Sequence, residues 1–258
     1  MGTGGAVAGG SGGAAAPVDG ALSSCVTTGS EFCDDFEGGV LDMQKWKTVK
    51  PSASASITVD DVHARSGKYA VHIKVVPNQQ STAMISESVT FPATPNSFYS
   101  RMFVYFSPEI PTAAGADFHT GFMFGTGKND RGTTQIGMGM IGSAKQWLGY
   151  SIFFGNPKLE YGPWSNKVRM VANQWICVEL FEDGSNPETE IRQIWIDDQE
   201  LTELRSDSAK SAGGNPNHRP PAFDGVSFGL WEYHPIPTLS DMWMDDIRVS
   251  SKKIGCTN

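Results

Sequence analysis

Alternation of apolar and polar residues, repeated along most of the chain after residue 32, limits the fold more than any other feature. In the segment YAVHIKV at 69–75 every second residue is apolar, while His72 and Lys74 lie between them. A repeat of two residues is typical of a strand with one buried face. Helical periodicity is almost absent, and 111–116 and 201–210 are at most short helical turns. Similar alternation or apolar runs occur at 98–106, 117–124, 133–141, 147–154, 175–181, 191–196, 226–233 and 242–249. About ten or more strands without an internal repeat predict an all-β fold, an antiparallel β-sandwich of two sheets.

Composition narrows the class of protein. The 258 residues include 7 Trp and 14 Phe, enough apolar surface for one sizeable core. The formal charge is −8, from 20 basic and 28 acidic residues, and nothing resembles a Lys/Arg patch. We therefore expect no nucleic-acid partner. No apolar run approaches the roughly 18 residues that span a membrane. We expect a soluble protein, most simply a monomer.

The first 24 residues, MGTGGAVAGGSGGAAAPVDGALSS, are rich in Gly, Ala and Ser and lack periodicity. Such a segment buries too little to offset the entropy of ordering it, so we predict a flexible tether at 1–24 and one folded domain at 25–258. No basic segment precedes an apolar stretch, so a signal peptide is not expected within it. Its Gly9-Gly-Ser-Gly-Gly13 string matches G-x-S-x-G without the strand and helix that a serine hydrolase needs.

The chain contains Cys25, Cys33, Cys177 and Cys256, with no C-x-x-C pair that would suggest zinc. An even number placed near the ends of a domain favours disulfides and hence a secreted or cell-surface protein. Three pairings are possible. Cys25–Cys33 with Cys177–Cys256 is preferred because the first pair closes a short loop, and four free thiols in a cytosolic protein remain the alternative.

Four motifs occur in a suggestive order: FCDDFEG at 32–38, LDMQKW at 41–46, ARSGKYA at 64–70 and MWMDDIRV at 242–249. This order resembles that of the concanavalin A-like jelly rolls of carbohydrate-active proteins, a group that includes glucuronan-lyase-like polysaccharide lyases, related secreted proteins and carbohydrate-binding modules. The resemblance covers most of 32–256. It implies a jelly roll that binds a polysaccharide or oligosaccharide.

The resemblance also implies a structural calcium ion. Its ligands would be Glu37, a backbone carbonyl of the turn at Ser66, Gly67 or Lys68, and Asp245. Asp245 shares its parity with Trp243 and Ile247, so it should point inward, where a carboxylate needs a partner. Calcium prefers several oxygen ligands. The alternative is that Asp245 pairs with a basic group or with backbone amides.

Function should lie on a sheet face opposite the core. On four strands, alternation presents Tyr99 and Arg101, then His119, Gly121 and Met123, then Gln135, Gly137 and Gly139, and finally Gly229, Trp231 and Tyr233. Glycines leave room for a bulky ligand near the sheet, and aromatic rings offer faces to sugars.

These residues permit β-elimination on a uronic-acid polymer. Arg101 and Gln135 could neutralise the sugar carboxylate, His119 could act as the base and Tyr233 as the acid, with Tyr99 and Trp231 binding substrate. Each has a structural alternative: Arg101 could bridge surface carboxylates, and His119, Tyr233 and Trp231 could simply pack.

We favour a lyase over a non-catalytic, lectin-like protein that uses the same groove. A third reading is a surface protein with a purely structural sandwich. The acidic charge counts mildly against a polyanionic substrate, unless Lys128, Arg131, Lys145, Lys158, Lys167 and Arg169 rim the groove.

Hydrolysis needs a carboxylate pair. The E-x-D-x-x-E string of laminarinase-type hydrolases is missing, and Glu87 and Glu232 are the only loose candidates. The Gln-x-His motif of alginate lyases is also missing, since Gly137 stands where the histidine would be.

Overall fold

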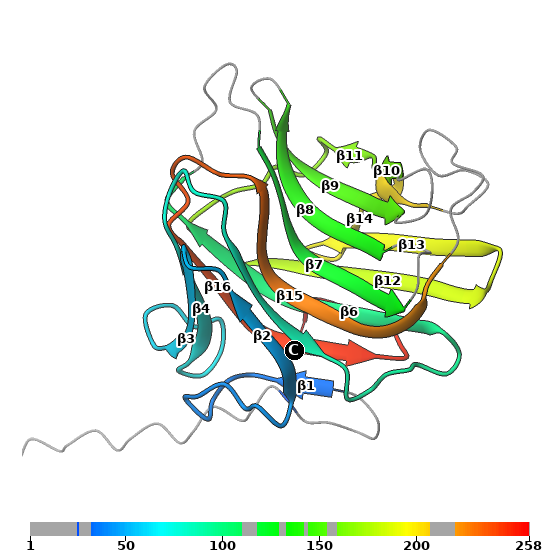
Figure 1. The fold of residues 1–258 in the computed structure, drawn as a ribbon, viewed down its shortest axis with the longest axis horizontal. Helices are drawn as coiled ribbons and strands as arrows, with labels where there is room; N and C mark the ends of the chain where they lie inside the picture. Colours follow the sequence, from blue (N-terminus) through cyan, green and yellow to red (C-terminus); the bar gives the residue numbers. More distant parts are fainter. Residues whose placement is uncertain are drawn as a thin grey trace, which may run out of the picture.

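The computed structural model describes residue 25 and residues 32–109, 118–128, 133–141, 144–153, 159–206 and 220–257. The expected tether at 1–24 and the expected turn at 111–116 lie outside these residues. The described part contains two eight-stranded sheets, A and B, in which every pairing is antiparallel (Figure 1). This confirms the all-β prediction. The only helix among the described residues is a 3-10 turn, η1 (Thr202–Leu204), inside the short turn expected at 201–210.

Sheet A contains both ends of the folded region. Its order is β14-β13-β12-β6-β16-β4-β3, with β1 also beside β16. The strands are β1 (Phe32–Asp34), β3 (Ala55–Asp60), β4 (Ala70–Val75), β6 (Ser97–Ser107), β12 (Ile176–Asn186), β13 (Thr189–Ile196), β14 (Gln199–Glu200) and β16 (Asp241–Ser250).

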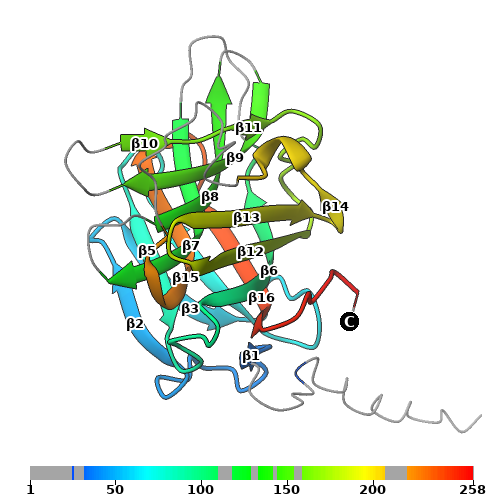
Figure 2. The ribbon, with the colours of Figure 1, turned by 90° about the vertical axis from the view of Figure 1, so that its right-hand side faces the viewer.

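Sheet B has the order β10-β9-β8-β7-β15-β5-β2, with β11 also paired to β9. Figure 1 shows β7, β8 and β15 as long, bent, neighbouring strands, and Figure 2 shows the view turned by 90°. The strands are β2 (Trp46–Pro51), β5 (Thr82–Glu87), β7 (Phe118–Lys128), β8 (Thr133–Ile141), β9 (Ala144–Phe153), β10 (Leu159–Tyr161), β11 (Trp164–Ser165) and β15 (Ala222–His234).

The core lies between the two sheets and is built by the apolar half of each alternation. Phe106 of β6 stacks on Phe122 of β7 with ring centroids 6.5 Å apart, which joins sheet A to sheet B. Trp46 of β2 is fully buried and meets Phe36 and Phe228. Aromatic contacts of this kind add to the burial of apolar area that drives the sheets together.

Both disulfides have the preferred pairing, Cys25–Cys33 and Cys177–Cys256. The second bond ties the end of the chain to β12. Glu179, also on β12, accepts hydrogen bonds from the backbone amides of Ile254 and Gly255 at 2.7 and 3.2 Å. The C-terminal segment is therefore fixed to sheet A by covalent and polar contacts.

Two β-bulges place residues on the opposite side of the sheet from the side that alternation predicts. In β16 the register shifts between Asp245 and Arg248 at the left-handed residue Asp246, so Trp243 and Asp245 share the outer side of the sheet. An extra residue reverses the parity beyond it, which is why Ile247 nevertheless reaches the core. The prediction that Asp245 points inward is therefore wrong.

The second bulge is in β7, between Gly121 and Met123. Met123 is fully buried and its sulfur accepts the Ser100 hydroxyl across the sandwich, whereas Phe124 meets Trp231 on the outer face. Met123 is thus a core residue, and Phe124, which alternation placed on the core side, takes the outer position that was expected for Met123.

Among the described residues, no helix has the length and apolar character needed to cross a membrane.

Candidate functional site

Four neighbouring strands of sheet B are hydrogen-bonded in sequence and together form much of its outer face. Their register partners form three rows that run across β9, β8, β7 and β15. Neighbouring strands lie about 4.8 Å apart, so each row is a continuous strip of surface. The rows are Gln146–Gly139–His119–His234, Leu148–Gly137–Gly121–Trp231 and Tyr150–Gln135–Phe124–Ser227.

Three glycines are adjacent in the first two rows. Gly139 lies between Gln146 and His119, and Gly137 lies beside Gly121. We call Gly121, Gly137 and Gly139 the glycine floor. Because none of them carries a side chain, they contribute only backbone to this part of the face.

An aromatic strip borders the floor. Trp231 meets Phe124 at 6.1 Å and Tyr233 at 5.9 Å, and Tyr233 meets His234 at 4.6 Å between ring centroids. Trp231 is half-buried and Tyr233 is 47% exposed. A half-buried indole ring beside an exposed tyrosine suits contact with a sugar.

Of the six predicted catalytic and substrate-binding residues, four lie on sheet B. His119, Gln135, Trp231 and Tyr233 belong to β7, β8 and β15. Gln135 and His119 are not in one row. Four residues of β8 separate Gln135 from Gly139, the partner of His119, or about 13 Å at ~3.3 Å per residue.

Arg101 and Tyr99 lie on β6 of sheet A, which corrects the expectation of one shared groove. Arg101 is fully buried, donates to the carbonyls of Gly255 and Asp246 at 3.0 Å each, and lies over Phe103. Burial and the nearby Arg248 lower its pKa to about 10. Arg101 holds the C-terminal segment and β16, and it cannot meet a sugar bound on sheet B.

Tyr99 likewise packs within its own sheet. Its ring stacks on Phe181 at 4.3 Å, and burial together with Glu179 and Asp183 raises its pKa. Farther along the same face, His72 stacks on Trp243 at 4.1 Å. The His72 imidazole also lies between the carboxylates of Asp60 and Asp241. These side chains on the outer face of sheet A are therefore held by contacts within the protein.

Glu87 and Glu232 do not form a hydrolytic pair. Glu232 lies beyond Trp231, the partner of Thr82, whereas Glu87 pairs with Val226, so their positions along β5 differ by roughly 20 Å. Glycoside hydrolysis needs a separation below about 10 Å. Glu232 instead accepts the amides of Ser81 and Ile236, at 3.1 Å each. Burial raises its pKa to about 7.

The structure describes only some of the basic residues that were expected to rim the groove. Arg131 and Lys158 lie outside the described residues. Lys145 pairs with Glu109, and Lys167 pairs with Glu203 at 2.6 Å. Burial and the nearby Arg169 lower the pKa of Lys145. These two lysines are therefore matched to carboxylates of the protein itself.

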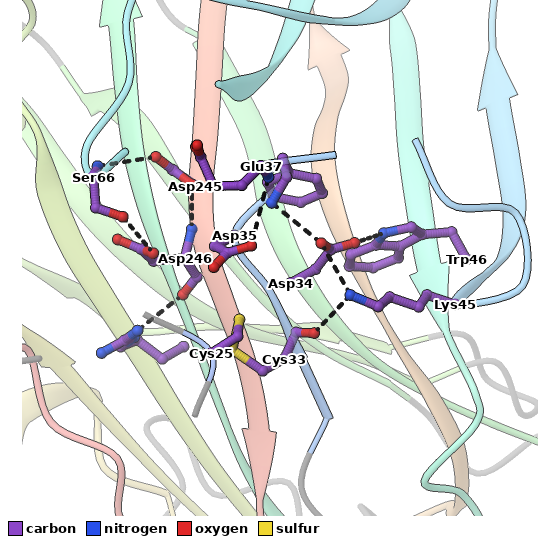
Figure 3. Close-up of a disulfide and its surroundings, with 12 residues drawn as sticks. Cys25, Cys33, Asp34, Asp35, Glu37, Lys45, Trp46, Ser66, Asp245 and Asp246 are labelled. Carbon is purple, nitrogen blue, oxygen red and sulfur yellow. Dashed lines mark hydrogen bonds and ion pairs between the residues drawn. A yellow bond between two sulfur atoms is a disulfide. The ribbon is translucent and has the colours of Figure 1, made fainter. Parts of the chain in front are cut away.

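The predicted calcium ligands gather where β1 approaches β16 (Figure 3). Glu37 accepts the amides of Lys68 and Tyr69 at 2.8 and 2.9 Å, and Asp245 accepts those of Arg65 and Ser66 at 2.8 and 3.2 Å. The turn that contains Gly67 thus bridges the two carboxylates. Backbone amides satisfy both, and for Asp245 this is the alternative that the sequence left open.

The carboxylate oxygens at this place are suitable calcium ligands, but they are few. Burial and the adjacent Asp246 raise the pKa of Asp245 to about 7, which a bound cation would reverse. Across the described residues, no three His, Cys, Asp or Glu side chains are grouped closely enough to hold a metal ion. Carboxylate and carbonyl oxygens fit calcium chemically, so the site stays a prediction.

Sequence reasoning missed the contribution of β9. Trp147 is fully buried in the core, so its neighbours Gln146 and Leu148 face the other way, toward the rows described above. Alternation around Trp147 was the signal that could have found them. Phe124 was missed because the bulge in β7 carries no clear mark in the sequence.

Comparison with known proteins matches this architecture. Residues 35–252 match the model of the Cip1-like core domain of the polysaccharide-lyase-like family. No curated protein sequence matches the chain significantly.

Three solved structures share the fold at low sequence identity. The cellulose-induced protein Cip1 is 16% identical, with a TM-score of 0.55 over 88% of this chain and 100% of its own. An endo-β-1,4-glucuronan lyase from the fungus Trichoderma reesei is 13% identical, with a TM-score of 0.55 over 86% and 95%. The alginate lyase Aly36B is 12% identical, with a TM-score of 0.56 over 89% and 99%.

Proposed function

Since the chain belongs to the polysaccharide-lyase-like family, with a Cip1-like core domain over residues 35–252, we propose that it cleaves a uronic-acid-containing polysaccharide by β-elimination. The substrate lies across the outer face of sheet B, over the glycine floor. Its sugar rings contact Trp231 of the aromatic strip, and Gln135 binds a sugar unit next to the one that reacts.

The reaction needs one base and one acid on this face. The His119 imidazole takes the proton from C5 of the sugar, and the electron pair forms a C4=C5 double bond as the C4–O bond breaks. The Tyr233 hydroxyl gives its proton to the departing oxygen, and exchange with water restores both side chains. Positioned acids and bases contribute about 10²- to 10⁴-fold each.

The register of β7 with β15 is the observation that carries this proposal. His119 is the partner of His234, which directly follows Tyr233 in the chain. A base and an acid on adjacent strands can meet opposite sides of one glycosidic linkage. Tyr233 is also 47% exposed, so a ligand on this face can reach the residue.

Ultraviolet absorbance of the new double bond tests the proposal. The protein is incubated with polyglucuronate, alginate and polygalacturonate, and we expect absorbance to rise with at least one. His119→Ala and Tyr233→Phe should each lower the rate about 10²-fold or more. Tyr105→Phe, on the outer face of sheet A, is the matched control and should leave it unchanged.

A wild-type protein that binds one of these polymers without any rise in absorbance would disprove the lyase. In that case the aromatic strip favours the second candidate, a non-catalytic carbohydrate-binding protein. That reading predicts that Trp231→Ala abolishes retardation in an affinity gel, whereas His119→Ala has no effect.

We also propose that the protein acts outside the cell and that calcium joins its chain ends. Two disulfides support an extracellular location, because reducing compartments rarely keep them. Glu37, a carbonyl of the Gly67 turn and Asp245 would hold the ion. Removing calcium with a chelator should then lower the Tm, and Asp245→Asn should abolish that response; an unchanged Tm would remove the calcium.

A further inference from the structure

Gln146 of β9 has a buried amide oxygen that the fold does not use. The side chain is 8% exposed, and its Oε1 has no hydrogen-bond partner. A buried polar atom without a partner costs about 1–3 kcal/mol, so proteins satisfy nearly all of them. A group of this kind needs an explanation, and a role in catalysis or in holding a molecule from outside the chain is one.

The position of Gln146 points to which ligand it would meet. It lies in the row of His119, with Gly139 between them. Two strand spacings separate the backbones of Gln146 and His119, about 10 Å. Because Gly139 has no side chain, a sugar ring could lie over it and reach both residues.

We propose that Gln146 is a substrate-binding residue for the sugar unit from which His119 removes the proton. Its Oε1 accepts only, so the missing partner is a donor, and a sugar hydroxyl supplies one. The amide nitrogen of the same group can donate to the sugar carboxylate. Gln146 thereby fills the place near His119 that Arg101, on the other sheet, cannot take.

This role rests on the proposed function, since it needs a polysaccharide on sheet B. It also makes a separate prediction about the stability of the folded protein. Replacing an unpartnered buried amide with an apolar side chain of similar length removes a desolvated polar atom and nothing that the fold uses. Binding should suffer while the folded state does not.

The experiment compares Gln146→Met with wild type in Kd for the bound polymer, in steady-state kinetics and in Tm. We expect Kd and KM to rise about tenfold, kcat to stay within about threefold, and Tm to be equal or higher. Gln193→Met is the matched control. Gln193 lies on the outer side of β13 in sheet A and donates to Glu200, so its loss should leave Kd unchanged.

Each result decides one point. An unchanged Kd in Gln146→Met overturns the inference, and so does a lower Tm, because it would mean that the amide stabilises the fold; Gln146→Leu repeats both measurements with a second shape. A wild type that binds without cleaving disproves the lyase alone, and the Kd comparison still judges Gln146. A wild type that binds no polymer of the panel overturns both.

Discussion

At the scale of single residues, carboxylates that hold backbone amides recur throughout the fold. Glu37, Glu87, Glu179, Glu232 and Asp245 each accept at least two amides of a loop or turn. Each loop is thereby fixed to a strand or to the chain end beside it. Part of the acidic charge is therefore buried inside the fold, so the net charge of −8 says less about the substrate than it first suggested.

The raised pKa of Glu232 makes the stability of the fold depend on pH. Burial raises its pKa from 4.5 to about 7, so between these values the folded state binds more protons than the unfolded chain. Stability from this group is complete below about pH 4.5 and is lost as the pH rises through about 7. We expect Tm to fall from pH ~5 to pH ~8, and Glu232→Gln to reduce that fall, as measured by calorimetry.

The exposed Glu188 provides the control for this measurement. Glu188→Gln should keep the pH dependence of the wild type. If Glu232→Gln also kept the full pH dependence of Tm, the raised pKa of Glu232 would not be its cause.

Gly67 shows how strictly one turn is specified. Its φ is +59°, and a Cβ there would lie 2.3 Å from the carboxyl carbon of Glu37. Gly67→Ala should therefore lower the free energy of unfolding by about 1–3 kcal/mol in urea. Gly38→Ala, where a Cβ would meet nothing within 4 Å, should change it by less than about 0.5 kcal/mol. Equal losses would contradict this account of the turn.

At the scale of elements, alternation predicted most of the long strands, and bulges limited what it could assign. The pattern at 69–75 became β4, and that at 191–196 became most of β13. Asp245 and Met123 were assigned to the wrong side because one extra residue in β16 and in β7 reverses parity. Strict alternation makes no allowance for an inserted residue, so it assigns residues before and after a bulge to one face when they lie on opposite faces.

The two disulfides should differ in their effect on stability. Cys177–Cys256 closes a separation of 79 residues and Cys25–Cys33 one of 8. Loop entropy in the unfolded chain gives about 4.5 kcal/mol for the longer loop and about 2.5 kcal/mol for the shorter. Replacing Cys177 and Cys256 by Ala should lower the unfolding free energy more than replacing Cys25 and Cys33, and the opposite order would contradict the entropic account.

At the scale of the whole molecule, the assignment of strands to sheets decided which predicted residues could work together. Alternation shows which side of a strand a residue occupies, but it does not show which sheet the strand joins. Tyr99 and Trp231 were both correctly expected to lie opposite the core, yet β6 and β15 belong to different sheets. That choice depends on pairings between segments far apart in the chain, such as β6 with β16, which no local pattern records.

The two outer faces should therefore respond differently to the same kind of substitution. Sheet B carries the glycine floor beside Trp231, whereas Tyr99 on sheet A is stacked against Phe181. We expect Trp231→Ala to weaken polysaccharide binding about tenfold, or 1.4 kcal/mol, and Tyr99→Ala to leave it unchanged while lowering Tm. Affinity electrophoresis and calorimetry on the same samples measure both. Loss of binding in Tyr99→Ala, with Trp231→Ala unaffected, would move the binding surface to sheet A.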